Sequence, residues 1–208
     1  MAPEEDQAEV RRLFGEFLNG GQIQSFQVLL NRLLARTVLR PSHSGLRLIR
    51  NRNDPSRCTL GGPGRAASPE PLPLRDGRYL HVNMSVRKTR TPHGQRWKVY
   101  ESRVQYQLDR EMASDAWVFR YDYLREPRGA QPAAHLNVNA TPGVGLDSLP
   151  NRSFHGFHFP TRRVSLERVI CLLADDFGVP CATERTAWYP TLRLADDLFR
   201  QIAHDPQA

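Results

Sequence analysis

The sequence contains few cysteines and no long apolar run. Cys58, Cys171 and Cys181 are the three cysteines among 208 residues, and no two of them have the Cys-x-x-Cys spacing. An odd number of cysteines without the Cys-x-x-Cys spacing favours a reducing compartment over a disulfide framework. No run of about 18 apolar residues is present, so we expect no membrane span. The acidic start of the chain, residues 4–6, lacks the apolar segment of a signal peptide, which predicts a cytoplasmic protein.

Acidic residues are too few to balance the basic ones. The chain has 29 Lys and Arg against 22 Asp and Glu, a formal net charge of +7, and most of the basic residues are Arg. The guanidinium group is a rigid fork of donors that suits phosphate. The charge therefore favours nucleic acid as a partner, with RNA the first candidate. A high-GC coding bias, which replaces Lys by Arg, accounts for the same composition, and this alternative stays open.

The N-terminal part of the chain has the pattern of a helical hairpin. Apolar residues repeat at helical spacing over residues 4–18 and again over residues 23–38, with Gly20 and Gly21 between them. We place this hairpin at residues 1–42; it must pack on the rest of the chain or on a partner, such as a second copy in a homo-oligomer. Residues 43–77 are predicted to be a loop-rich linker region, because Gly and Pro are frequent after residue 61.

From residue 78 the apolar period changes to two, which predicts an α+β domain at residues 78–208. We expect a meander of antiparallel strands at residues 79–87, 97–108, 117–124 and 134–140. In the second strand, Val99 is expected to share a face with Glu101 and Arg103. One helix begins after Ser165, a good N-cap, and the last helix covers residues 190–203. The predicted fold is an antiparallel sheet of about four to six strands, packed with C-terminal helices and preceded by the helical hairpin.

Three histidines late in the chain suggest acid–base chemistry on a phosphodiester. These are His135, His155 and His158, and Arg162 and Arg163 follow just before the predicted helix N-terminus. Imidazole exchanges protons near neutral pH, and a helix N-terminus favours anions. His155 and His158 point to opposite faces of a regular strand, because their offset is odd. We therefore expect His158 to work with His135, with no metal or other cofactor.

Two alternatives compete with this interpretation. A metal site of His135, His155, His158 and Asp122 has suitable ligand types, but its spacing matches no strong metal motif. In the structural alternative, His158 is a hydrogen-bonded residue that packs the sheet against the helix, and His155 is simply exposed.

Aromatic residues follow one face of the third predicted strand. Trp117, Phe119, Tyr121 and Tyr123 are expected on one face, with Arg120 and Asp122 on the other. Tyr121 and Tyr123 could stack nucleic-acid bases, as aromatic residues on RNA-binding sheets do. The competing interpretation is that this aromatic face belongs to the hydrophobic core.

From about Val104 onward, over roughly half of the chain, the sequence contains four short blocks: Val104-Gln105-Tyr106-Gln107-Leu108, Trp117-Val118-Phe119-Arg120-Tyr121-Asp122-Tyr123, Ala134-His135-Leu136-Asn137-Val138 and His158-Phe159-Pro160-Thr161-Arg162-Arg163-Val164-Ser165-Leu166-Glu167. In their order these blocks resemble the TumE-like toxin family of bacterial toxin–antitoxin modules. The resemblance implies a small α+β toxin, a helix-turn-helix antitoxin as partner, and RNA cleavage as the activity. By position, it makes Arg120, Asp122, His135 and His158 the catalytic candidates. The alternative function is a non-catalytic basic module that binds nucleic acid or protein.

Overall fold

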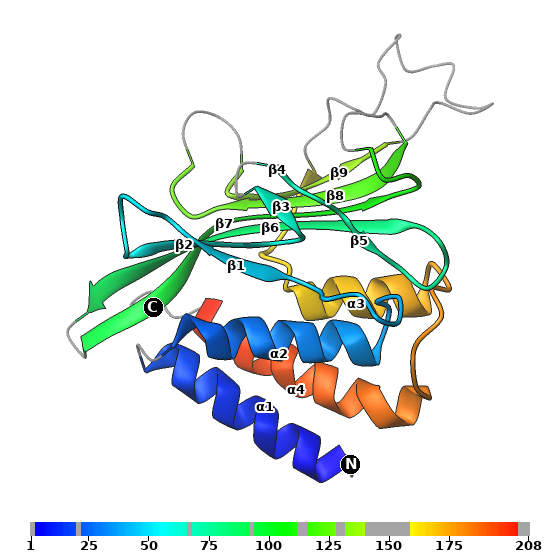
Figure 1. Ribbon diagram of the computed structural model, residues 1–208, viewed down its shortest axis with the longest axis horizontal. Coiled ribbons are helices and arrows are strands. Elements are labelled where there is room, and N and C mark those ends of the chain that lie inside the picture. Colours follow the sequence, from blue (N-terminus) through cyan, green and yellow to red (C-terminus); the bar gives the residue numbers. More distant parts are fainter. Residues whose placement is uncertain are drawn as a thin grey trace, which may run out of the picture.

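The chain combines one large antiparallel sheet with helices that all lie on the same face of the sheet (Figure 1). The computed structural model describes residues 3–19, 22–65, 68–91, 94–111, 116–127, 132–139 and 159–203. The described helices are α1 (Pro3–Leu18), α2 (Ile23–Arg36), α3 (Leu166–Asp175) and α4 (Arg185–Ala203). The strands are β1 (Arg47–Arg50), β2 (Arg57–Gly61), β3 (Gly64–Arg65), β4 (Ser68–Pro69), β5 (Leu72–Pro73), β6 (Tyr79–Thr91), β7 (Gly94–Gln107), β8 (Trp117–Leu124), β9 (Ala134–Val138) and β10 (Phe159–Pro160). The predicted α+β class is confirmed.

The sheet has the strand order β1-β2-β6-β7-β8-β9-β10, and β5 pairs with β6 outside this path. Its eight described strands exceed the four to six expected, because short strands from the N-terminal half join it. The predicted meander is present as β6, β7, β8 and β9, each antiparallel to the next. The β3–β4 hairpin forms a separate two-stranded sheet.

Residues 43–77, expected to form a loop-rich linker region, contribute β1 to β5. Leu72 and Leu74 are fully buried in the core, although Pro71 and Pro73 flank them. Gly61 and Gly62 permit this packing, since a Cβ atom on Gly62 would lie only 1.8 Å from the Glu70 carbonyl oxygen. The glycines that suggested a flexible linker therefore allow close backbone contact.

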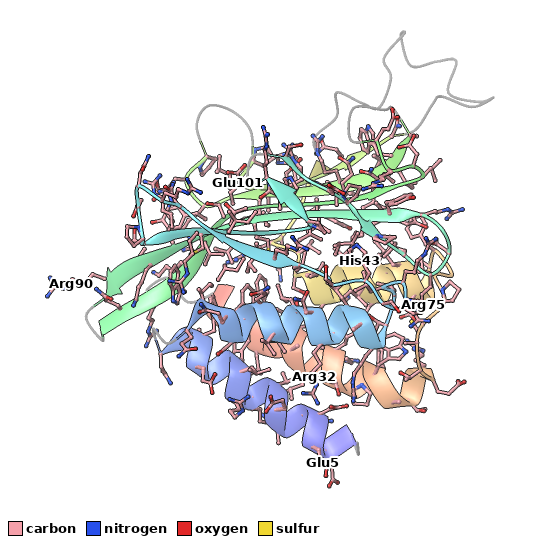
Figure 2. All side chains as sticks on the ribbon, in the orientation of Figure 1. Glu5, Arg32, His43, Arg75, Arg90 and Glu101 are labelled. Atoms are coloured by element: carbon pink, nitrogen blue, oxygen red, sulfur yellow. The ribbon has the colours of Figure 1, made fainter. Side chains whose placement is uncertain are left out.

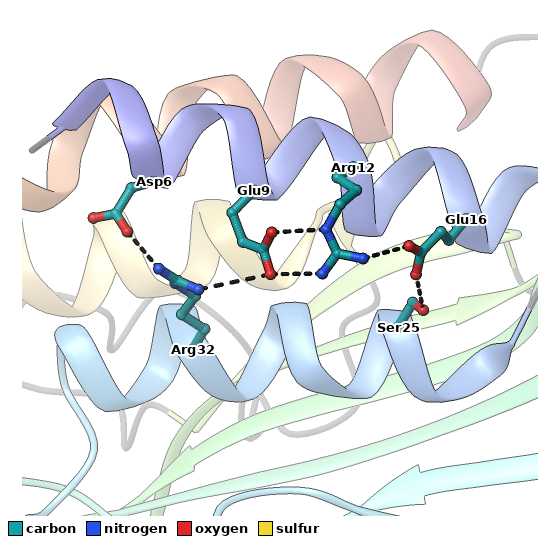
Figure 3. Close-up of polar contacts among 6 residues, drawn as sticks. All are labelled: Asp6, Glu9, Arg12, Glu16, Ser25 and Arg32. Atoms are coloured by element: carbon teal, nitrogen blue, oxygen red, sulfur yellow. Dashed lines mark hydrogen bonds and ion pairs between the residues drawn. The ribbon is translucent and has the colours of Figure 1, made fainter. Parts of the chain in front are cut away.

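The N-terminal helical hairpin packs on the chain itself. The apolar faces of α1 and α2 are buried, and the Phe17 and Phe26 rings stack with centroids 4.3 Å apart. Polar residues join the two helices along their outer edge: Arg32 of α2 donates to the buried Asp6 of α1 at 2.7 Å, and Ser25 donates to Glu16 at 2.5 Å (Figure 3). The hairpin thus belongs to the same hydrophobic core as the sheet.

Two β-bulges change which side chains share a face. Opposite Ser85 and Val86, the extra residue is Tyr100, so Val99 turns to the helix side and is buried while Glu101 stays exposed on the other face. The predicted sharing of a face by Val99 and Glu101 is therefore wrong. A second shift opposite Tyr106 and Gln107 makes Val118 the extra residue in β8.

The second bulge also corrects the position of Trp117. Its register partner is Gln107, and it lies on the side of Arg120, whose guanidinium carbon is 5.6 Å from the Trp117 ring centroid. The predicted common face of Trp117 with Phe119 is wrong, because a bulge reverses the alternation of side chains in the bulged strand.

The predicted C-terminal helices are both present. Ser165 caps α3 as expected, since its hydroxyl accepts a hydrogen bond from the Arg168 backbone N–H at 3.1 Å. Helix α4 begins at Arg185, before the expected start at Pro190, which lies inside the helix. No helix among the described residues is both long enough and apolar enough to cross a membrane.

Candidate functional site

The sheet face opposite the helices, which we call the outer face, carries two neighbouring rows of polar side chains. In the first row, Asn83 pairs with Arg103, Arg103 with Asp122, and Asp122 with His135. In the second row the paired residues are His81, Gln105, Arg120 and Asn137. Side chains of paired residues lie on the same face of a sheet. The strand register therefore gathers these groups from β6, β7, β8 and β9.

Asp122 is the centre of this cluster. Its Oδ1 accepts a hydrogen bond from Arg103 Nε at 2.9 Å. Its Oδ2 accepts from Arg120 Nε at 2.6 Å and from Asn137 Nδ2 at 2.9 Å. One carboxylate thus holds donors from three strands, and it compensates one of the two guanidinium charges.

The two arginines use their Nε atoms to bind Asp122, which leaves their terminal nitrogens directed elsewhere. Arg103 has 47% of its side chain exposed and Arg120 has 26%. An Arg held by one edge and exposed at the other is preorganised to bind a phosphate. Together with Asp122, the pair carries a net charge of +1.

His135 lies beside this carboxylate. Its Nδ1 is 3.1 Å from the Pro132 carbonyl oxygen, which can only accept, so Nδ1 carries a proton. Its Nε2 lies 3.6 Å from Asp122 Oδ2. With Nδ1–H directed at Pro132, Nε2 is the ring nitrogen that faces the Asp122 carboxylate.

A second histidine, His81, is buried in the neighbouring row. Burial and the nearby Arg103 lower its pKa to about 4, and its Nδ1 has no hydrogen-bond partner among the described residues. At neutral pH the ring is therefore uncharged. His81 belongs to the polar row as a neutral group and does not serve as a proton donor there.

Arg162 and Arg163, predicted to bind phosphate, lie on the other side of the sheet. Both line a cavity of about 450 Å³ beside α3 and α4, whose walls also include Asp175, Asp176 and Asp196. Arg163 is sandwiched by aromatic rings: its guanidinium carbon lies 4.4 Å from the Tyr123 centroid and 4.5 Å from that of Phe199. Burial lowers the pKa of Arg163 to about 10. The structure does not bring these arginines together with Asp122 and His135.

Tyr121 and Tyr123, predicted to stack bases, are on the helix side of β8. Tyr121 is partly buried and packs against the core, with its ring centroid 5.6 Å from that of Phe119. Tyr123 contacts Arg163. Arg120 and Asp122 lie on the opposite face, as predicted. The aromatic residue of β8 on the outer face is Trp117.

Of the three histidines selected from the sequence, the described residues include His135. His155 and His158 lie outside the described residues, so the predicted pairing of His158 with His135 stays a prediction. No group of three or more His, Cys, Asp or Glu side chains that could hold a metal ion occurs in the described part of the chain.

Arg103, Asn137 and His81 belong to the cluster but were not among the predicted site residues. Asn137 follows His135 by two residues in one strand, so the period of two could have placed it on the same face. Arg103 and His81 become neighbours of Asp122 and Arg120 only through the register of β6, β7 and β8, which the sequence alone does not give.

Comparisons of the chain with family models, with curated proteins and with solved structures found no match. The functional argument therefore rests on the residues of the cluster and on their geometry.

Proposed function

We propose that the protein binds RNA on the outer face of its sheet and acts as a metal-independent, ribonuclease-like toxin in the cytoplasm. The observation that supports this proposal is the convergence of Arg103, Arg120 and His135 around Asp122. Two guanidinium groups supply charge for a phosphodiester, and an imidazole beside them supplies a group that exchanges protons. The resemblance to TumE-like toxins adds a helix-turn-helix antitoxin as the expected protein partner.

In the proposed binding mode, Asp122 is a positioning residue. Because three donors already engage its carboxylate, Asp122 holds Arg103 and Arg120 in place and does not serve as a base. The terminal nitrogens of the arginines bind the phosphate oxygens in a bidentate manner. Trp117, next to Arg120 on the outer face, offers a ring for an adjacent base.

The proposed reaction is attack of a ribose 2′-oxygen on the neighbouring phosphorus. One group takes the 2′-hydroxyl proton, and a second group gives a proton to the departing 5′-oxygen. The P–O2′ bond forms and the P–O5′ bond breaks, which leaves a 2′,3′-cyclic phosphate and a 5′-hydroxyl. His135 and His158 exchange these two protons, and the arginines stabilise the charge on the phosphorane.

The second candidate is a binding module without chemistry. It is favoured by the full engagement of the Asp122 carboxylate, which makes the cluster a scaffold for two arginines and leaves a single described histidine beside it. In this case RNA binding needs Arg103 and Arg120, and replacing His135 has no effect on it.

The experiment is incubation of the purified protein with total RNA, with and without a chelator. We expect cleavage that the chelator does not reduce, and products that end in a 2′,3′-cyclic phosphate. His135→Asn should abolish cleavage while the Asn amide replaces the Nδ1–H donor to Pro132. Arg103→Gln together with Arg120→Gln should weaken binding as well as cleavage.

The matched control is Arg11→Gln, an exposed arginine of α1 on the helix side of the molecule. It changes the net charge without touching the outer face, so binding and cleavage should remain at the wild-type level. Binding without cleavage in the wild type would support the module without chemistry. Absence of RNA binding at low salt would exclude both candidates.

A further inference from the structure

The β6–β7 hairpin extends beyond the rest of the sheet as a two-stranded arm. The last pair of β6 with β2 is at Arg87, and the last pair of β7 with β8 is at Glu101. Residues 88–91 and 94–98, which we call the arm, have strand partners in the described structure only in each other, and the Lys88 N–H donates to the Ser56 carbonyl oxygen at 2.7 Å where the arm begins. Figure 2 shows Arg90 far from the body of the molecule, pointing outward.

The arm and its base are strongly basic. The sequence has no Asp or Glu between Asp76 and Glu101. The cations of the arm and its base are Arg87, Lys88, Arg90, Arg96 and Lys98. Among the described residues, no ion pair is found at Lys88, Arg90 or Arg96, and the acid that interacts with Arg87 is Asp54, which Arg57 already holds at 2.8 Å. Unpaired cations this close repel one another, so a bound anion stabilises the arm.

The base of the arm is held firmly on the helix layer. Trp97 is only 7% exposed and lies against the aromatic residues Phe14, Phe17 and Phe26 of α1 and α2. Lys88 lies over the Trp97 ring, with Nζ 5.8 Å from its centroid. The buried aromatic residue anchors the strands, so the cations are presented on a preorganised ribbon.

Three of these cations lie on the same face as the Asp122 cluster. Arg87 pairs with Lys98 in register, and Thr89 pairs with Arg96, both on the outer face. Arg96 and Arg103 are seven residues apart in β7, a span of about 23 Å at the usual rise of a strand. The arm and the cluster therefore form two basic regions on one face, and the exposed Glu101 lies between Arg96 and Arg103 along β7.

We propose that the arm is a second RNA-binding element, and that single-stranded RNA runs along β7 from the arm to the Arg103–Arg120 cluster. This inference rests on the proposed function for the occupant of the cluster. A single strand suits two separated basic regions, because its flexible backbone can pass from one to the other while a base stacks on an aromatic ring such as Trp117. The arm's described side chains include no exposed apolar group that could enter a membrane, which argues against a lipid surface.

The test measures binding of a fluorescein-labelled, 2′-O-methylated oligouridine dodecamer, which cannot be cleaved, by fluorescence anisotropy at several salt concentrations. The double variant Arg96→Gln/Lys98→Gln, which removes two cations of the outer face, should make the slope of log affinity against log salt shallower by about 1.4, since each lost contact contributes about 0.7. This corresponds to about a sevenfold smaller loss of affinity on a fourfold rise in salt. The control Arg11→Gln/Arg193→Gln removes the same charge from α1 and α4 and should leave the slope unchanged.

Glu101→Gln provides a gain-of-function test. If RNA passes from the arm to the cluster, the exposed carboxylate repels it, and removing that charge should tighten dodecamer binding severalfold. A trinucleotide is too short to reach both regions, so the wild type should bind it more weakly than the dodecamer. Equal dodecamer binding by wild type and Glu101→Gln would overturn the continuous path.

The outcomes separate the arm from the proposed function. If Arg103→Gln/Arg120→Gln loses binding while the arm variant keeps the wild-type slope, the arm inference is wrong and the cluster stands. If only the arm variant loses binding, the cluster proposal is wrong and the arm stands as the RNA-binding element. Tighter binding of a duplex than of the single strand, or arm-dependent binding to phosphatidylserine vesicles in place of RNA, would overturn the assignment of the occupant.

Discussion

Glu167 should make the protein less stable as the pH rises from acidic to neutral. This residue stands in the first turn of α3 and is 2% exposed; the small cavity that it lines is also lined by the apolar Phe26 and Leu30 and by Arg163. Burial raises the pKa of its carboxyl group from 4.5 to about 7, with a further contribution from Asp196. The folded protein therefore keeps the Glu167 proton at pH values where the unfolded chain has lost it.

The magnitude follows from the difference between the two proton affinities. Each tenfold change in proton binding is worth about 1.4 kcal/mol, so the shift corresponds to about 3 kcal/mol at most. Because the folded pKa is raised, this stabilisation is fully present below pH 4.5 and is lost as the pH rises through about 7. Glu167→Gln, which keeps the shape and cannot ionise, should be about 3 kcal/mol more stable than the wild type at pH 8.

Urea unfolding of the wild type and of Glu167→Gln at pH 4.5, 6 and 8 measures this difference directly. The two proteins should be nearly equal at pH 4.5, and at pH 8 the variant should be about 3 kcal/mol more stable; in a parallel thermal scan at pH 8 it should melt about 6 to 12 °C higher. The matched control is Glu184→Gln, whose side chain is exposed and whose stability should follow the wild type at every pH. A stability difference between Glu167→Gln and the wild type that does not change with pH would refute the reasoning.

Three further predictions concern the sheet. Because the pKa of His81 is lowered in the folded protein, the neutral ring's contribution to stability is intact above pH 6.5 and is lost as the pH falls toward 4. His81→Gln has no ring to protonate, so between pH 6.5 and pH 4 it should lose up to about 3 kcal/mol less stability than the wild type in urea unfolding. Asp122→Asn should cost about 1 to 2 kcal/mol in thermal unfolding, because Arg103 and Arg120 lose a charged acceptor and remain partly solvated; an unchanged melting temperature would contradict this. Trp97→Ala should lower the free energy of unfolding by about 3 kcal/mol and increase amide hydrogen exchange in the arm, because the arm loses the buried side chain that anchors it.

Strand and helix positions were predictable where the apolar period is undisturbed. Strand β8 was expected at residues 117–124 and is found there, and Ser165 caps α3 as its side chain and position suggested. The alternation of faces along a strand fails at Tyr100 and Val118, because each is an extra residue in its strand, and every side chain beyond it points to the face opposite the one expected. No pattern of apolar residues marks such an insertion, so the faces of Val99 and Trp117 were assigned wrongly.

The candidate site was predictable only in part. Arg120, Asp122 and His135 were candidates by position in the resemblance to TumE-like toxins, and the structure brings these three together on one face. Arg163 was selected because it precedes a helix N-terminus, but its aromatic neighbours come from β8 and α4, which are far from it in sequence. Long-range packing decides whether an arginine meets solvent or an aromatic sandwich, and local spacing carries no information about it.

The same interactions that define the candidate site also fix the register of the sheet. Asp122 binds one donor from β7, one from its own strand and one from β9, so a slip of either neighbour by one residue would break an ion pair or a hydrogen bond. Such a slip would also turn Phe119 and Tyr121 away from the core. A half-buried carboxylate is costly without partners and is stabilised by three of them. The arginines are consequently held where the sheet requires them, and the proposed contact with a phosphate would need no further ordering of their side chains.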